Sequence, residues 1–135
     1  MPVIDASVVV TALADAEHAR WAEVQLSVGG ANRALWAPHL IDAEVGQALR
    51  REAAAGRLGE DRADAALSDL ARMPLRRIDH VGLLHRAWDL RHNLSFYDSL
   101  YVALAEVLDA PLVTLDRRLA RAAGDATGVT VLTAG

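Results

Sequence analysis

The stretch Pro2-Val3-Ile4-Asp5-Ala6-Ser7 decides the expected fold, because a short apolar run ends abruptly in an acidic residue. Apolar runs that end in polar residues are typical of strands buried on both faces of a parallel sheet. The same order returns in Leu112-Val113-Thr114-Leu115-Asp116. Ligands of open parallel sheets bind outside the carboxyl ends of the strands. We therefore expect Asp5 and Asp116 to lie on the functional edge of such a sheet.

Between these stretches, apolar runs alternate with longer segments of helical period, which predicts a parallel sheet covered by helices on both faces. The expected strands are Pro2–Ile4, Leu35–Ala37, Leu75–Ile78, Leu112–Leu115 and Val129–Leu132. The expected helices are Ser7–Leu13, Ala19–Val28, Ile41–Ala55, Glu60–Arg72, Val81–Arg91, Ser95–Leu108 and Arg117–Ala123. The segment Ala53–Arg62 is predicted to form the tip of a helical hairpin. A length of 135 residues fits one domain spanning 1–135.

Composition excludes several classes of mechanism. All 14 basic side chains are arginine, and the chain has neither lysine nor cysteine. Schiff-base chemistry, thiol nucleophiles, thiolate zinc sites and lysine-containing phosphate loops are therefore excluded. The formal net charge of -4 argues against a protein that simply coats nucleic acid, but it leaves a nucleic-acid enzyme open.

The apolar stretch Val3–Leu13 lacks a basic leader and carries Asp5, so we do not expect a signal peptide. No stretch of the sequence approaches the roughly 18 consecutive apolar residues that a membrane span needs. We expect a cytoplasmic protein with no membrane partner.

Four acidic residues stand where a soluble fold rarely places a charge, namely Asp5, Glu44, Asp98 and Asp116. Asp5 and Asp116 each precede an expected helix, so each is either an N-cap or a metal ligand. Gathering several buried carboxylates is costly unless a cation joins them. An oxygen-only set favours Mg²⁺, with Mn²⁺ as its substitute, over Zn²⁺. The four acids together predict a metal-dependent enzyme.

The acids in the middle of the chain also have purely structural interpretations. Glu44 lies at the edge of the apolar stripe of its helix, where its carboxylate either reaches water or projects toward a site. Asp98 follows Ser95 at the spacing of a capping box, in a turn whose apolar neighbours predict burial. Ser7 is either a capping hydroxyl or a group that orients a metal ligand, and Thr114 is expected within reach of the same pocket.

Four segments carry a resemblance to a known family. They are Val3-Ile4-Asp5-Ala6-Ser7, Ala43-Glu44-Val45 with Ala48-Leu49-Arg50, Tyr97-Asp98-Ser99-Leu100-Tyr101-Val102-Ala103-Leu104-Ala105, and Val113-Thr114-Leu115-Asp116. Together they resemble the PIN-domain ribonucleases, and the chain length resembles that of the VapC-type toxins of bacterial toxin–antitoxin pairs. The resemblance covers nearly the whole chain.

The resemblance implies a three-layer α/β/α sandwich with a central parallel sheet and Mg²⁺-dependent endonucleolytic cleavage of RNA. It also implies a homodimer and an antitoxin that occupies the active site, with a basic side chain near the acids. The family's catalytic and metal-binding acids fall on Asp5, Glu44, Asp98 and Asp116, with Ser7 and Thr114 as supporting hydroxyls. The arginines after the acidic motifs are either contacts to the RNA backbone or solvated side chains: Arg50, Arg51, Arg117 and Arg118.

Three other functions remain open. An aspartyl-phosphate phosphatase also has an apolar strand ending in aspartate, but that pattern needs a second aspartate where Ser7 stands and a lysine that is missing. Response-regulator receivers likewise need a lysine, and their phosphoacceptor lies on a middle strand. A PIN-like module that binds a partner without catalysis is the third alternative, against which four intact acids argue.

Overall fold

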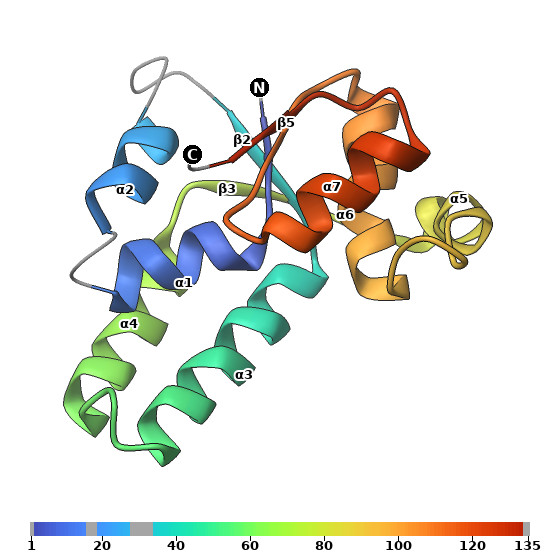
Figure 1. Cartoon of the computed structure of the whole chain (residues 1–135). Coiled ribbons are helices and arrows are strands. Elements are labelled where there is room, and N and C mark those ends of the chain that lie inside the picture. Colours follow the sequence, from blue (N-terminus) through green and yellow to red (C-terminus); the bar gives the residue numbers. More distant parts are fainter. Residues whose placement is uncertain (1, 16–18, 28–33, 134–135) are drawn as a thin grey trace.

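The computed structural model describes residues 2–15, 19–27 and 34–133, which form a parallel sheet between two layers of helices (Figure 1). The strands are β1 (Val3–Ile4), β2 (Leu35–Pro38), β3 (Leu75–Ile78), β4 (Leu112–Val113) and β5 (Val131–Leu132). Their order across the sheet is β3-β2-β1-β4-β5, and every neighbouring pair is parallel. The predicted α/β/α sandwich with a central parallel sheet is confirmed.

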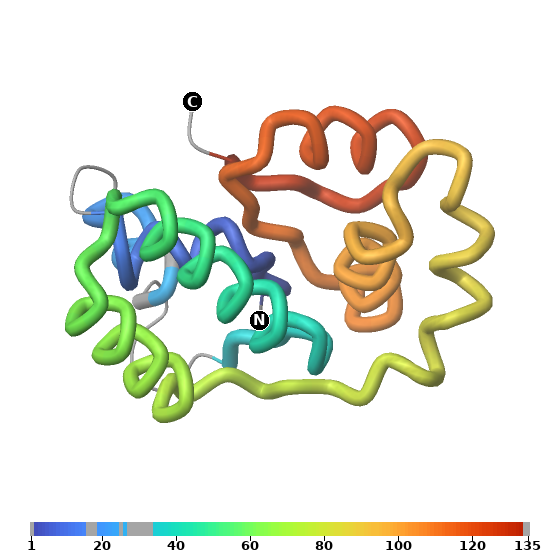
Figure 2. The backbone as a smooth tube through the Cα atoms, turned by 90° about the horizontal axis from the view of Figure 1, so that it is seen from below, coloured from blue at the N-terminus to red at the C-terminus, as the bar shows by residue number. Residues whose placement is uncertain are grey.

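The helices divide between the two faces according to the path of the chain (Figure 2). One layer holds α1 (Ala6–Ala14), α2 (Ala19–Ser27), α3 (Leu40–Ala54) and α4 (Glu60–Arg72), and the other holds α5 (Leu84–Asp89), α6 (Phe96–Leu108) and α7 (Arg117–Ala126). The chain moves from β1 through β2 to β3 in one direction, then crosses back to β4 and β5. Because crossovers are right-handed, this reversal puts the later helices on the opposite face.

The reversal lies between β1 and β4, where open parallel sheets bind their ligands. Val3 pairs with Leu112 and Ile4 with Val113, and none of these four residues is more than 2% exposed. Helix α6 packs against both strands, and its residues 99–105 are all buried. This packing holds the carboxyl ends of β1 and β4 side by side.

Two expected elements differ from the structure. The predicted strand Leu112–Leu115 ends at Val113, because the backbone N–H groups of Leu115 and Asp116 bind side-chain hydroxyls instead of continuing the strand. The predicted helix Val81–Arg91 is wrong as one element, since a 3₁₀ turn (Val81–Leu83) precedes the short helix α5. Gly82, a poor helix former, lies inside that turn.

Other expected elements agree within a few residues. The helical hairpin is confirmed, because α3 ends at Ala54 and α4 begins at Glu60. Gly56, with a φ of 75°, makes the turn between them in a conformation that favours glycine. The predicted helix end at Val28 falls outside the described residues. None of the helices in the described part of the chain is both long and apolar enough to cross a membrane.

Candidate active site

Asp5 follows β1 directly and is buried between two hydroxyl groups. Ser7 Oγ donates a hydrogen bond to Asp5 Oδ1 at 2.5 Å, and Thr114 Oγ1 donates one to Oδ2 at 2.6 Å. Ser7 N also donates to Oδ1, at 3.1 Å, so Asp5 is the N-cap of α1, as one of its two interpretations predicts. The residue is only 6% exposed, and this burial raises the pKa of its carboxyl to about 6.

Ser7 and Thr114 tie the loop after β4 to the end of β1. Each hydroxyl donates its proton to Asp5 and accepts a hydrogen bond from a backbone N–H of that loop. Ser7 Oγ accepts from Leu115 N at 2.9 Å, and Thr114 Oγ1 accepts from Asp116 N at 2.9 Å. The two hydroxyls therefore hold Asp116 at the same edge of the sheet as Asp5.

Asp116 is the N-cap of α7. Its Oδ1 accepts hydrogen bonds from Arg118 N at 2.9 Å and from Leu119 N at 3.1 Å. The capping interpretation thus holds for Asp116 as well as for Asp5. A carboxylate has about four acceptor positions, and these two bonds occupy two of them, so capping and cation binding are compatible.

Glu44 lies half-buried on α3 and receives a hydrogen bond from the far side of the site. Tyr101 Oη, on α6, donates to Glu44 Oε1 at 2.7 Å. Burial raises the pKa of Glu44, whereas this hydrogen bond lowers it. Burial and the charges of Glu44, Asp5 and Asp98 raise the pKa of Tyr101, so its hydroxyl remains a donor at neutral pH.

Tyr101 is a site residue that the sequence does not single out, because it stands inside the apolar segment that follows Asp98. The residue is 1% exposed, its hydroxyl contacts Glu44, and the charges of Asp5 and Asp98 also act on that hydroxyl. Tyr101 stands three positions after Asp98, a spacing that puts both on one face of a helix. This spacing is the feature of the sequence from which Tyr101 could have been predicted to lie near the site.

Asp98 lies in the first turn of α6 and links the set of acids electrostatically. Ser95 Oγ accepts a hydrogen bond from Asp98 N at 3.1 Å, so Ser95 is the N-cap, as the capping-box spacing predicts. Burial raises the pKa of Asp98, and the charge of Asp116 raises it further. The charge of Asp98 in turn adds to the raised pKa values of Asp5 and Glu44. The charge of Asp98 is thus coupled to the charges of Asp5, Glu44 and Asp116.

The oxygen atoms of the four acids and two hydroxyls are chemically suited to a hard divalent cation. Within residues 2–15, 19–27 and 34–133, no three carboxylate or imidazole side chains are placed closely enough to hold a metal ion. The four acids and two hydroxyls nevertheless offer only oxygen donors, which Mg²⁺ and Mn²⁺ prefer. Burial is the main cause of the raised pKa values of Asp5, Glu44 and Asp98, and like-charge repulsion adds to it; a bound cation would relieve that repulsion.

Two of the four arginines border the acids. Arg118 lines a small cavity with Asp98, and its charge opposes the rise in the pKa of Asp98 that burial causes. Arg51 lines another cavity with Glu44. Arg50 donates from Nε to Oε1 of its helix neighbour Gln47 at 3.0 Å. The remaining one, at position 117, is exposed on α7.

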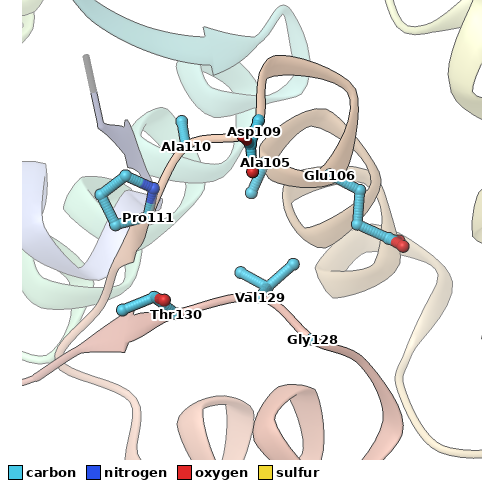
Figure 3. Close-up of a pocket in the computed structure, with 8 residues that line it drawn as sticks. All are labelled: Ala105, Glu106, Asp109, Ala110, Pro111, Gly128, Val129 and Thr130. Atoms are coloured by element: carbon cyan, nitrogen blue, oxygen red, sulfur yellow. The ribbon is translucent and has the colours of Figure 1, made fainter.

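A separate cavity of about 400 Å³ lies at the opposite end of the sheet (Figure 3). It is bordered by Glu106 and Asp109 at the end of α6, and by Pro111 and Thr130, which precede β4 and β5. Glu106 Oε1 accepts a hydrogen bond from Arg86 Nε at 3.0 Å. The described residues that line this cavity include none of the four acids.

Comparison with known proteins finds a matching family model and relatives that are named ribonucleases. The family model of the PIN domain matches residues 3–125. Ribonuclease VapC9 of Mycobacterium tuberculosis is 44% identical to this chain over 119 residues, which is 88% of each chain. Ribonuclease VapC1 of the same species is 53% identical over 89 residues, which is 65% of this chain and 67% of that protein.

The solved structure of Mycobacterium tuberculosis VapC20, described as a Sarcin-Ricin loop cleaving toxin, is also similar to this chain. The TM-score is 0.68 at 18% sequence identity, covering 90% of this chain and 95% of that one. At this identity the likeness concerns the fold alone.

Proposed function

We propose, from the premise that this chain belongs to the PIN domain family, that it is a metal-dependent endoribonuclease and the toxin of a toxin–antitoxin pair. Two relatives that share 44% and 53% of aligned residues with it are named ribonucleases. The observation that carries the proposal is the buried Asp5, held by hydrogen bonds from Ser7 and Thr114, together with the electrostatic coupling of Asp98 to the other acids. The proposed site lies at the edge of the sheet where the strand order reverses.

The proposed reaction is hydrolysis of an RNA phosphodiester by water. When bound, Mg²⁺ supplies positive charge at the phosphoryl group and activates water for attack. Asp5, Glu44, Asp98 and Asp116 would hold the cation, with Mn²⁺ as a substitute. Ser7 and Thr114 keep the Asp5 carboxylate in one orientation, and Tyr101 does the same for Glu44.

Arginine side chains at the border of the acids are proposed to hold the RNA backbone. Arg118 stands beside Asp98, and Arg51 shares a cavity with Glu44. A guanidinium binds phosphate oxygens through paired hydrogen bonds and remains charged at all working pH values. Arg50 and Arg117, which are both exposed, are proposed to contact the RNA backbone farther from the acids.

Cleavage of a mixed RNA pool by the purified protein tests the proposal. We expect internal cuts with Mg²⁺ or Mn²⁺ and none with chelator, and we expect Asp5→Asn to abolish them. Asp64→Asn, at an exposed position on α4, is the matched control and should cleave like the parent. Cleavage that survives chelator would overturn the proposal. Hydrolysis of a phosphomonoester in place of RNA would favour the phosphatase alternative.

The proposed partners are an antitoxin and a second copy of this chain. The repulsion among the acids makes the site attractive to a basic side chain in the absence of metal. We expect the product of the neighbouring open reading frame to inhibit cleavage. We also expect a homodimer at micromolar concentration in light scattering. A monomer whose activity is unaltered by that product would contradict this part of the proposal.

A further inference from the structure

A cavity of about 300 Å³ lies directly beside Glu44 and is distinct from the one at the opposite sheet edge. It is lined by residues of α3 and by one residue of α6: Leu40, Ala43, Glu44, Gln47, Arg51 and Tyr97. The α3 residues recur at three- and four-residue spacings, so they form one face of the helix. Because Glu44 belongs both to this lining and to the acid set, the cavity adjoins the proposed active site.

Tyr97 presents an aromatic ring at this cavity. It is 59% exposed, whereas Tyr101, one turn further along α6, is 1% exposed and holds Glu44. An exposed aromatic face beside a phosphodiester site is the usual stacking platform for an unpaired base of RNA. Tyr101 thus contacts the acid set, and Tyr97 lines the cavity.

Hydrogen-bond donors lie on the α3 side of the cavity. Gln47 Oε1 already accepts from Arg50, so the side-chain amide of Gln47 offers its N–H groups. Arg51 is exposed, and its guanidinium forms no hydrogen bond or ion pair with another described residue. Two donor groups one helical turn apart suit the acceptors on a base edge, such as O6 and N7 of guanine.

We propose that this cavity binds one unstacked nucleobase of single-stranded RNA, stacked on Tyr97 and hydrogen-bonded at its edge by Gln47 and Arg51, so that Arg51 contacts the base in place of the RNA backbone. The inference rests on the proposed ribonuclease function and adds a base-binding subsite next to the scissile phosphate. A base inside a duplex cannot enter the cavity, so the subsite selects single-stranded or looped RNA.

Fluorescence of 2-aminopurine tests the subsite. Eight single-stranded RNA octamers, each with 2-aminopurine at one position, are bound to the protein in Ca²⁺, which replaces Mg²⁺ to suppress cleavage. We expect quenching at one position of the octamer. Tyr97→Ala should remove the quenching and raise the Kd roughly tenfold, while Tyr97→Phe, which keeps the ring, should preserve both. In cleavage assays Tyr97→Ala should raise KM and leave kcat within about twofold of the parent.

Separate outcomes address the subsite and the proposed function. If the parent cleaves RNA but Tyr97→Ala binds and quenches like the parent, the subsite is wrong and the ribonuclease proposal stands. Equal loss in Tyr97→Ala and Tyr97→Phe would also overturn stacking. If the parent neither binds nor cleaves RNA, both proposals fail. Because Tyr97 is exposed, the variants should melt like the parent, which a thermal scan checks.

Discussion

The hydroxyl of Tyr101 donates a hydrogen bond to Glu44 Oε1 at 2.7 Å and so joins α6 to α3 across the acid set. The hydroxyl is buried and also lies within the electrostatic influence of Asp5 and Asp98. A neutral donor in this position offsets part of the repulsion among the carboxylates. Glu44 is therefore held in place before any cation arrives.

Tyr101→Phe removes this donor and keeps the ring. We expect the affinity for Mn²⁺ to fall roughly 10- to 100-fold, because hydrogen bonds to ligating carboxylates orient them. The free energy of unfolding in chelator should fall by about 1–2 kcal/mol, since a half-buried carboxylate loses its partner. Calorimetric Mn²⁺ titration and urea denaturation measure the two effects. Tyr97→Phe should change neither, and an unaltered Mn²⁺ affinity in Tyr101→Phe would refute the role of the hydroxyl.

Thr114→Val replaces a fully buried hydroxyl with a methyl group of similar size. Asp5 Oδ2 then loses a donor and Asp116 N loses its acceptor, which should lower the free energy of unfolding by roughly 2–4 kcal/mol. Thr114→Ser keeps the hydroxyl and loses one buried methyl, at a cost of about 1 kcal/mol. Urea denaturation compares the variants. A Val variant as stable as the Ser variant would show that the hydrogen bonds contribute little.

The metal-free protein should lose stability as the pH rises from about 4 to about 6. The folded-state pKa of Asp5 is about 6, above its ordinary value of 3.8, so the folded protein binds the proton more tightly than the unfolded chain does. This contribution is fully present below pH 4 and is lost by about pH 6, amounting to roughly 3 kcal/mol. Asp5→Asn should flatten this part of the profile. Denaturation of both proteins in chelator at several pH values checks the difference, and parallel profiles would contradict it.

Asp98→Asn distinguishes a structural from an electrostatic role for Asp98. The capping hydrogen bond uses Asp98 N and Ser95 Oγ, so the variant retains it. Removal of the charge relieves repulsion with Asp116, and the variant should therefore melt no lower than the parent in chelator. Mg²⁺ should raise the melting temperature of the parent more than that of the variant. Equal shifts, with RNA cleavage retained in the variant, would remove Asp98 from the proposed site.

The sequence predicted the positions of Asp5 and Asp116 because a local pattern, an apolar run ending in an acid, determines which edge of a sheet a residue occupies. It left open whether each acid is a cap. Each acid caps its helix through Oδ1, so the capping signal was real and did not compete with the other interpretation. The metal-binding role of these acids stays a prediction.

Contacts between segments that are distant in the chain could not be predicted from the sequence. The strands β1 and β4 have two residues each, too few for any pattern to specify that they are neighbours. The hydroxyl of Tyr101 meets a partner 57 positions away, and nothing in its own neighbourhood indicates that partner. The segment Val81–Arg91 was predicted as one helix because its period is helical, yet tight turns that follow Leu90 end α5 early.

Asp5 and Thr114 are joined by one hydrogen bond although 109 positions separate them in the chain. During translation, β1 and α1 leave the ribosome long before Thr114 has been synthesised. A nascent fragment that ends before β4 therefore carries Asp5 with one of its two hydroxyl partners and without the neighbouring strand that buries it. A protein proposed to cut RNA would thus complete its site only after residue 116 has been synthesised.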